Sequence, residues 1–155
     1  MLGRSAVVAL ILSSLVTPVI LSAQSFPYTE GSVWGISMNR IKPGRGDDYY
    51  NDLRASLKRQ LDEAKRQGLV LSYKLITTDA TNPSDWNLLL MVEYKNMAAL
   101  DGLRSKMEPI ASRTVGTQEE RRGRAMKRNE MREVIGTKLG REIILRDSLP
   151  GQTSR

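Results

Sequence analysis

The sequence contains no cysteine and no histidine among its 155 residues. It therefore lacks the usual ligands of zinc, haem iron and iron–sulfur clusters, and it cannot form a disulfide bond. Serine and cysteine nucleophiles that depend on a histidine base are excluded as well. We expect no metal, no cofactor, and a fold that its apolar core or dimerisation must stabilise.

Aromatic residues are also scarce, at 5% of the chain with a single phenylalanine, so aliphatic side chains and methionine must fill the core. The length allows one domain, because domains usually have about 100 to 150 residues. The formal net charge is +7, from 24 Lys and Arg against 17 Asp and Glu. Such a charge suits acidic ligands, nucleic acid or anionic lipid, but it also keeps an ordinary protein soluble, and we adopt the latter interpretation.

The first 25 residues have the order of a bacterial secretory signal peptide. Arg4 gives a positive start, residues 5–21 are mostly apolar, and small residues follow up to Ser25. We expect cleavage after Ala23 or after Ser25, giving a secreted or periplasmic protein with no membrane attachment. The alternative is an uncleaved anchor helix, for which Pro18 and a length of roughly 17 residues are marginal.

Hydrophobic periodicity predicts the elements that follow. Alternation predicts strands at 33–41, 69–76, 86–95 and 139–146. Spacings of three and four predict helices at 47–66, from Asn96 to about Pro109, and at 118–135, where Gly136 closes the last one. Both faces of the third strand are apolar, so we expect it to be central in its sheet.

This order is βαββαβ with an additional helix before the last strand. It is the ferredoxin-like order, an α+β fold with helices on one face of an antiparallel sheet. We place the domain at 33–146, after a linker at 26–32 and before a flexible tail at 147–155. The other sheet face has no cover, so we expect a homodimer that buries Val70, Leu89 and Met91.

Three segments resemble the dimeric α/β barrel superfamily, which includes antibiotic-biosynthesis monooxygenase-like and NIPSNAP-like domains. They are VWGISMNRIKPGRGDDYY at 33–50, GLVLSYKLI at 68–76 and WNLLLMVEYKNMAAL at 86–100. The resemblance covers roughly residues 33–146 and implies a barrel made from two ferredoxin-like copies. It implies no catalytic residue, because neither the haem-binding histidine nor the polar set of the cofactor-free oxygenases has a matching position in this sequence.

Polar and aromatic side chains on the strands are the candidate ligand-binding residues. They are Trp34, Ser37, Tyr73, Lys74 and Glu93. If Lys74 and Glu93 both point inward they should pair, because a buried charge needs a partner. The alternatives are wet strand ends for the polar residues, and core or dimer packing for the aromatic ones.

Basic residues are concentrated in the last predicted helix. The run comprises Arg121, Arg122, Arg124, Lys127, Arg128 and Arg132. Acidic residues are interleaved with them at helical spacing, so we interpret the run as a solvated helix face.

These observations predict a domain that binds a small molecule, between sheet and helices or inside the barrel. A cofactor-independent, oxygenase-like enzyme is the alternative, although no pair of carboxylates has a diagnostic spacing. A nucleic-acid-binding module of the same element order is a third possibility. RNA-recognition domains display aromatic residues on the third strand, where this chain has aliphatic residues and Met91, so we expect no nucleic-acid partner.

Overall fold

A computed structural model describes residues 26–147 of the chain. The expected signal peptide lies outside the described residues and stays a prediction, as does all of the expected tail beyond Asp147.

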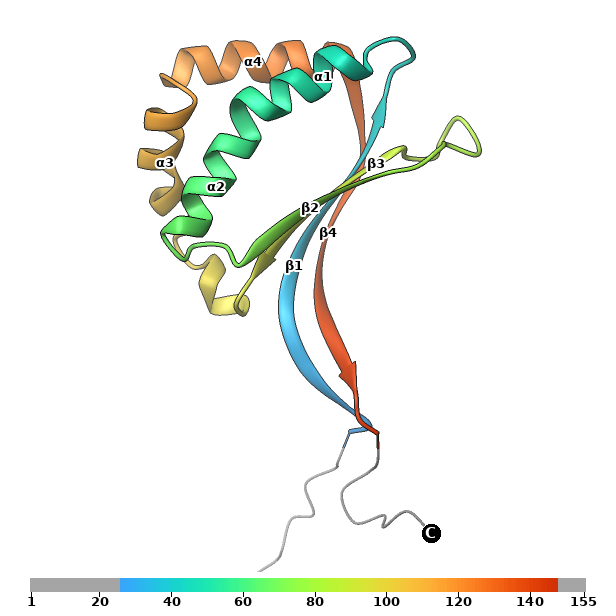
Figure 1. Cartoon of the computed structure of the whole chain (residues 1–155), viewed down its shortest axis with the longest axis vertical. Helices are drawn as coiled ribbons and strands as arrows, with labels where there is room; N and C mark the ends of the chain where they lie inside the picture. The colour runs from blue at the N-terminus through green and yellow to red at the C-terminus, as the bar shows by residue number, and fades with distance from the viewer. Residues whose placement is uncertain (1–25, 148–155) are drawn as a thin grey trace, which may run out of the picture.

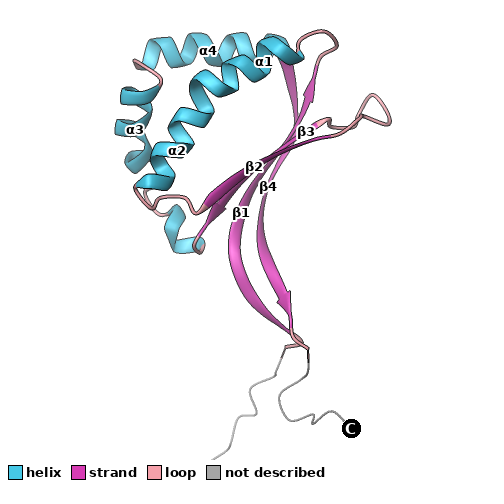
Figure 2. Cartoon of the chain, in the orientation of Figure 1, coloured by secondary structure: helices cyan, strands magenta, loops and turns pink. Residues whose placement is uncertain are grey.

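The sheet has four strands, and every neighbouring pair is antiparallel. The strands are β1 (Tyr28–Ile41), β2 (Ser72–Thr77), β3 (Leu88–Tyr94) and β4 (Arg132–Leu145). Their order across the sheet is β2-β3-β1-β4, which confirms the predicted central position of the third strand. Figure 2 shows β1 and β4 continuing as a two-stranded ribbon beyond the other two strands.

Within residues 26–147 the helices lie on one side of this sheet (Figure 1). α1 (Gly46–Leu53), the π-helical turn η1 (Arg54–Lys58) and α2 (Arg59–Arg66) follow one another without a break, between β1 and β2. The short 3₁₀ helix η2 (Met97–Leu100), α3 (Leu103–Thr114) and α4 (Gln118–Met131) connect β3 to β4. This strand order with helices on one face confirms the predicted ferredoxin-like α+β fold.

The core lies between the helices and the sheet, and aliphatic side chains dominate it. One buried cluster joins Ile41, Tyr49, Leu53, Leu88 and Met131, and a second joins Leu61, Ala64, Val70, Val92 and Ile110. The prediction that Val70 faces the uncovered side is wrong. The chain turns at Gly68, where φ is +71°, and β2 begins only at Ser72, so Val70 lies in the second cluster.

The other face of the sheet has no helix over it among the described residues (Figure 1). Strand register and alternation place apolar side chains there. They are Trp34, Ile36 and Met38 on β1, Leu89 and Met91 on β3, and Ile76 on β2. The predicted position of Leu89 and Met91 on this face is confirmed. We call these six residues the open face.

α4 ends at Met131, four residues before the predicted end, and β4 begins at Arg132. The strand is favoured because Arg132, Glu133 and Val134 pair with β1, at Ile41, Arg40 and Asn39. Gly136 is therefore not a helix stop but a strand residue opposite Met38. A Cβ at this position would lie 3.1 Å from the Met38 methyl carbon, so glycine leaves room for that side chain.

β1 begins at Tyr28, so most of the expected linker at 26–32 belongs to the sheet. Its first residues pair with the end of β4, where Tyr28 lies opposite Leu145 and Glu30 opposite Ile143. The polar sequence of this segment does not predict a strand. Backbone pairing with β4 forms the strand here, and a side-chain pattern does not report that pairing.

α3 continues through Pro109 to Thr114, whereas the sequence analysis placed its end near the proline. A proline inside a helix removes one backbone hydrogen bond and costs about 3 kcal/mol. Ile110 and Ala111 follow it and are both buried, so packing against the core offsets the local cost.

Glu63 links α2 to α3, and its carboxylate should make the free energy of unfolding decrease at low pH. Its carboxylate accepts hydrogen bonds from Arg66, Gln67 and Arg113. The side-chain hydrogen bonds from Arg66 are the main reason why its pKa falls from 4.5 to about 2. Because the folded-state pKa is lowered, this contribution is present above pH 4.5 and is lost as the pH falls towards 2.

We therefore expect Glu63→Gln to lower the urea midpoint at pH 7 and to lose most of that effect by pH 2.5. Glu130→Gln, on the exposed surface of α4, is the control and should shift the midpoint little at either pH. A Glu63→Gln effect of the same size at both pH values would contradict this account.

Candidate functional site

A cavity of about 210 Å³ lies between the helices and the strands β1 and β3. Its floor is formed by Ser37 and Asn39 on β1 and Leu90 on β3. The other lining residues come from α1, η1, α2, the α3–α4 connection, α4 and the start of β4: Tyr49, Leu53, Ser56, Leu57, Gln60, Val115, Arg121, Arg124, Arg128 and Arg132. The cavity lies at one of the two places that the sequence analysis proposed for a ligand, between sheet and helices rather than inside a barrel.

The π-helical turn η1 forms part of the cavity wall. Wider turns of this kind occur mostly as single interruptions of α-helices and frequently at functional sites. Ser56, in the middle of η1, is buried, and its hydroxyl donates a 2.6 Å hydrogen bond to the Asp52 carbonyl oxygen. The turn therefore brings a hydroxyl group and Leu57 to the cavity.

Asn39 is a polar residue in the core, with 1% of its surface exposed. Its side-chain amide donates to the carbonyl and hydroxyl oxygens of Ser37, each at 3.1 Å, and its side-chain oxygen accepts from Arg132. The Arg132 guanidinium also lies over the Tyr49 ring, 5.9 Å from its centroid. Its Nε is buried and has no hydrogen-bond partner among the described residues.

Two further arginines share one carboxylate. Arg124 and Arg128 of α4 lie 3.3 Å and 3.0 Å from the two Asp52 oxygens, and Arg128 also reaches the Ser56 hydroxyl at 3.4 Å. Arg121 instead ties α4 to α3 by bonding to Glu108, Ser112 and the Gly116 carbonyl.

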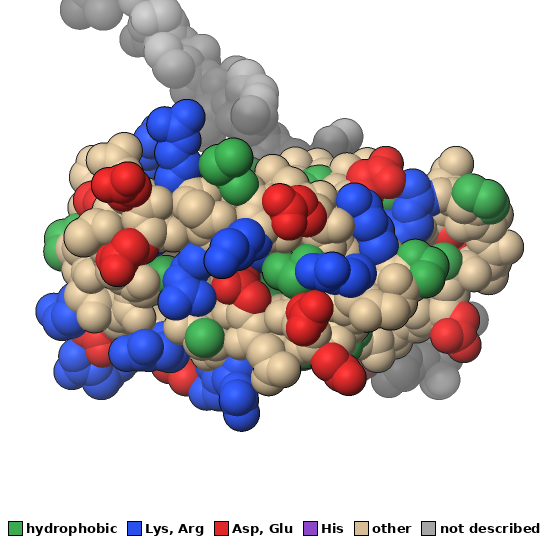
Figure 3. Space-filling view, turned by 90° about the horizontal axis from the view of Figure 1, so that it is seen from above, with side chains coloured by type: hydrophobic (Ala, Val, Ile, Leu, Met, Phe, Trp, Pro, Cys, Tyr) green, Lys and Arg blue, Asp and Glu red, His purple; other side chains and the backbone are tan. Residues whose placement is uncertain are grey.

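The interpretation of the basic run as a solvated face is therefore wrong for four of its members. Arg121, Arg124, Arg128 and Arg132 line the cavity. The interpretation as a solvated helix face does fit Arg122 and Lys127, which are exposed. Figure 3 shows basic and acidic side chains intermingled on the surface seen from the end of the molecule that carries α1 and α4.

Tyr49 contributes a phenol to the cavity wall. Burial raises its pKa, although the nearby Arg132 and Arg128 guanidinium groups act in the opposite direction. The phenol therefore stays protonated at neutral pH and can donate a hydrogen bond to a ligand.

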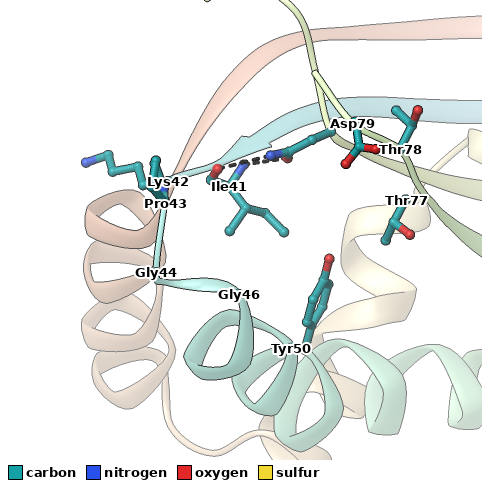
Figure 4. A pocket seen from close by; sticks show the side chains of 10 residues that line it. Ile41, Lys42, Pro43, Gly44, Gly46, Tyr50, Thr77, Thr78 and Asp79 are labelled. Carbon is teal, nitrogen blue, oxygen red and sulfur yellow. Dashed lines mark hydrogen bonds between the residues drawn. The ribbon is translucent and has the colours of Figure 1, made fainter. Parts of the chain in front are cut away.

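A second hollow, of about 520 Å³, lies between the β1–α1 loop and the β2–β3 loop (Figure 4). Tyr50 points into it, with Thr77 and Asp79 on its far side. Asn87 holds its base together by exchanging hydrogen bonds with the Ile41 backbone, at 2.7 Å and 3.1 Å. Its rim consists mainly of exposed loop residues, so we regard the arginine-lined cavity as the candidate site.

The structure divides the five predicted ligand residues between the two faces of the sheet. Ser37 lines the cavity. Tyr73 is on the same face but at the β2 edge, where its hydroxyl donates a 2.7 Å hydrogen bond to Asp62 and its ring packs on the second core cluster.

Trp34, Lys74 and Glu93 lie together on the opposite face. The Lys74 ammonium is 5.5 Å from the Trp34 ring centroid, and Glu93 accepts a hydrogen bond from Ser72. That hydrogen bond is the main reason why the pKa of Glu93 is lowered, and the charge of Lys74 adds to it. No salt bridge joins Lys74 to Glu93 in the described residues. By strand register these two side chains lie beside the open face, to which Trp34 belongs.

No group of three or more potential metal ligands occurs between residues 26 and 147. In the same part of the chain, none of the helices combines the length and apolar character needed to cross a bilayer.

No protein-family model matches the chain, and no curated protein matches it. Among solved structures, HapK from Hahella chejuensis is similar, with 14% identity, a TM-score of 0.42, and coverage of 79% of this chain and 97% of that one. A dimeric ferredoxin-like protein from an uncultured marine organism is 10% identical, with a TM-score of 0.45 and coverage of 79% and 95%. The fold assignment rests on the strand order of this chain itself.

Proposed function

We propose that the protein binds a small molecule in the cavity between its sheet and its helices, and that it does so as a homodimer. The observation that carries the binding proposal is the polar group of Asn39, Ser56 and Arg132 beside the cavity, in which the buried Nε of Arg132 has no hydrogen-bond partner among the described residues. A core of this size could be filled with aliphatic side chains, and buried polar groups cost free energy when they lack partners. Asn39 and Ser56 have partners within the protein, whereas a ligand with an acceptor atom would supply the one that Arg132 Nε lacks.

We propose that the homodimer forms through the open face, because the side chains on that face suit a dimer interface. The open face consists of six apolar side chains, and Ile76 among them is 46% exposed in the single chain. Lys74 and Glu93 lie on the same face. In a twofold dimer each charge meets the partner's surface, so a face that carries both signs can be self-complementary.

The ligand proposal is tested by native mass spectrometry of the gently purified protein. We expect the wild type to carry a small-molecule adduct, and Ser37→Leu to lose it because the added side chain fills part of the cavity. Ser84→Leu, in the exposed β2–β3 loop, makes the same chemical change away from the cavity and should keep the adduct. An adduct that survives Ser37→Leu, or a wild type with none, would contradict the proposal.

A further inference from the structure

We infer that the ligand is a small organic anion, bound by the guanidinium groups of Arg124, Arg128 and Arg132. Without the ligand, the Asp52 carboxylate pairs with Arg124 and Arg128 in its place. This inference rests on the proposed function and names the chemical class of its ligand. Its basis is the charge of the cavity, because four arginines line it, whereas the carboxylates that pair with three of them, Asp52 and Glu108, lie behind the lining.

The excess positive charge follows from the partners of each group. Arg121 is paired with Glu108, outside the cavity wall. Arg124 and Arg128 both bind Asp52, and within residues 26–147 the side-chain hydrogen-bond acceptor of Arg132 is the neutral oxygen of Asn39. Three cations and one anion leave a local charge of +2, which an incoming anion would offset.

Burial makes this charge costly without a ligand. The Asp52 side chain is only 15% exposed and that of Arg128 23%, so water screens this pair poorly, whereas the Arg124 side chain is 41% exposed and better screened. The buried Nε of Arg132 adds a donor with no acceptor. Carboxylates and phosphates match the planar donors of guanidinium groups better than other small ligands do, so these are the favoured headgroups.

The rest of the cavity selects for an apolar body on that headgroup. Leu53, Leu57, Leu90 and Val115 line it, with the Tyr49 phenol beside them. Its volume of about 210 Å³ is below the roughly 300 to 1,000 Å³ typical of pockets for drug-sized ligands. The ligand is therefore of the size of a substituted benzoate or a phenyl phosphate.

Isothermal titration calorimetry with benzoate, phenyl phosphate and benzyl alcohol tests the class. We expect either anion to bind at least tenfold more tightly than the neutral alcohol, and the preferred anion distinguishes a carboxylate ligand from a phosphate one. Arg128→Gln should weaken binding of that anion at least tenfold. Arg122→Gln removes the same charge from the exposed surface of α4 and should change it less than twofold.

Asp52→Asn provides a test with the opposite sign. Because the ligand replaces Asp52 as the partner of Arg128, removing its charge should tighten anion binding several-fold while the empty protein becomes less stable to heat. Arg124→Gln is a second weakening variant should Arg128→Gln fail to fold, as circular dichroism would show.

The outcomes separate this inference from the proposed function. If benzyl alcohol binds as tightly as the anions and Arg128→Gln changes nothing, the ligand is not anionic but the binding cavity stands. If none of the three probes shifts the amide resonances of Ser37, Ser56 or Leu90 at millimolar concentration, the inference of a small aromatic anion is contradicted, and the adduct measured by native mass spectrometry decides the proposed function separately.

Discussion

Met91→Lys is expected to convert the homodimer into a folded monomer. Met91 lies on β3, opposite Ile36 of β1 and Lys74 of β2, at the centre of the open face. Losing a buried methionine costs about 1.5 to 3 kcal/mol, and a twofold interface contains the substitution twice. The dissociation constant should therefore rise by at least roughly a hundredfold, and the two introduced ammonium groups would repel each other as well.

Light scattering over a micromolar concentration range measures this directly. Met126→Lys is the matched control, because it makes the same substitution on the outer surface of α4, where the methionine is 63% exposed. It should leave the dimer mass unchanged. A wild type that is monomeric throughout the range, or a Met91→Lys protein that remains dimeric, would show that the open face is not the interface.

The fold could be predicted because local periodicity and global topology agree. The strand at 86–95 is apolar on both faces, and it lies in the middle of the sheet as β3. The acidic residues Asp47 and Asp48 lie in the first turn of α1, where the helix dipole favours them.

The boundary between α4 and β4 could not be predicted for a physical reason. Met131, Val134 and Ile135 continue the apolar stripe of the helix, yet Val134 and Ile135 are β-branched and suit a strand equally well. Pairing with β1 decides between the two, and that pairing connects residues about ninety positions apart, as between Arg40 and Glu133. Local patterns carry no information on such contacts.

The arginines of the site were not predicted from the sequence, although their spacing carries a signal. Arg121, Arg124, Arg128 and Arg132 are spaced by three, four and four, which is one face of a helix. The acidic residues interleaved with these arginines favoured the interpretation of a solvated helix face. Asp52, which pairs with Arg128, lies 76 residues away in the chain, and no local pattern connects the two.

The candidate residues chosen from the strands illustrate a second limit. Alternation correctly separates Ser37 from Trp34, since neighbouring residues on a strand face opposite sides. It does not say which side the helices cover. The five residues were therefore grouped by chemistry, and the structure divides them between the cavity side and the open face.

Leu88→Ala is expected to lower the free energy of unfolding of the protomer more than the other substitutions proposed above. Leu88 is 1% exposed and lies in the core cluster with Ile41, Tyr49, Leu53 and Met131. Truncating a buried leucine to alanine costs about 2 to 5 kcal/mol, from lost burial together with the cavity that is left. The cluster joins β1, β3, α1 and α4, so the loss should appear as a fall in the free energy of unfolding of the whole domain.

Urea unfolding followed by circular dichroism, at one fixed protein concentration because of the proposed dimer, gives this free energy. Leu75→Ala is the matched control. Leu75 is on the same side of the sheet but 40% exposed at the β2 edge, so it should cost less than half as much. Because Leu88 packs in the same cluster as Tyr49, its loss should also loosen the cavity wall and weaken binding of any ligand held there. Equal losses for the two variants would mean that the first cluster does not anchor the helices to the sheet.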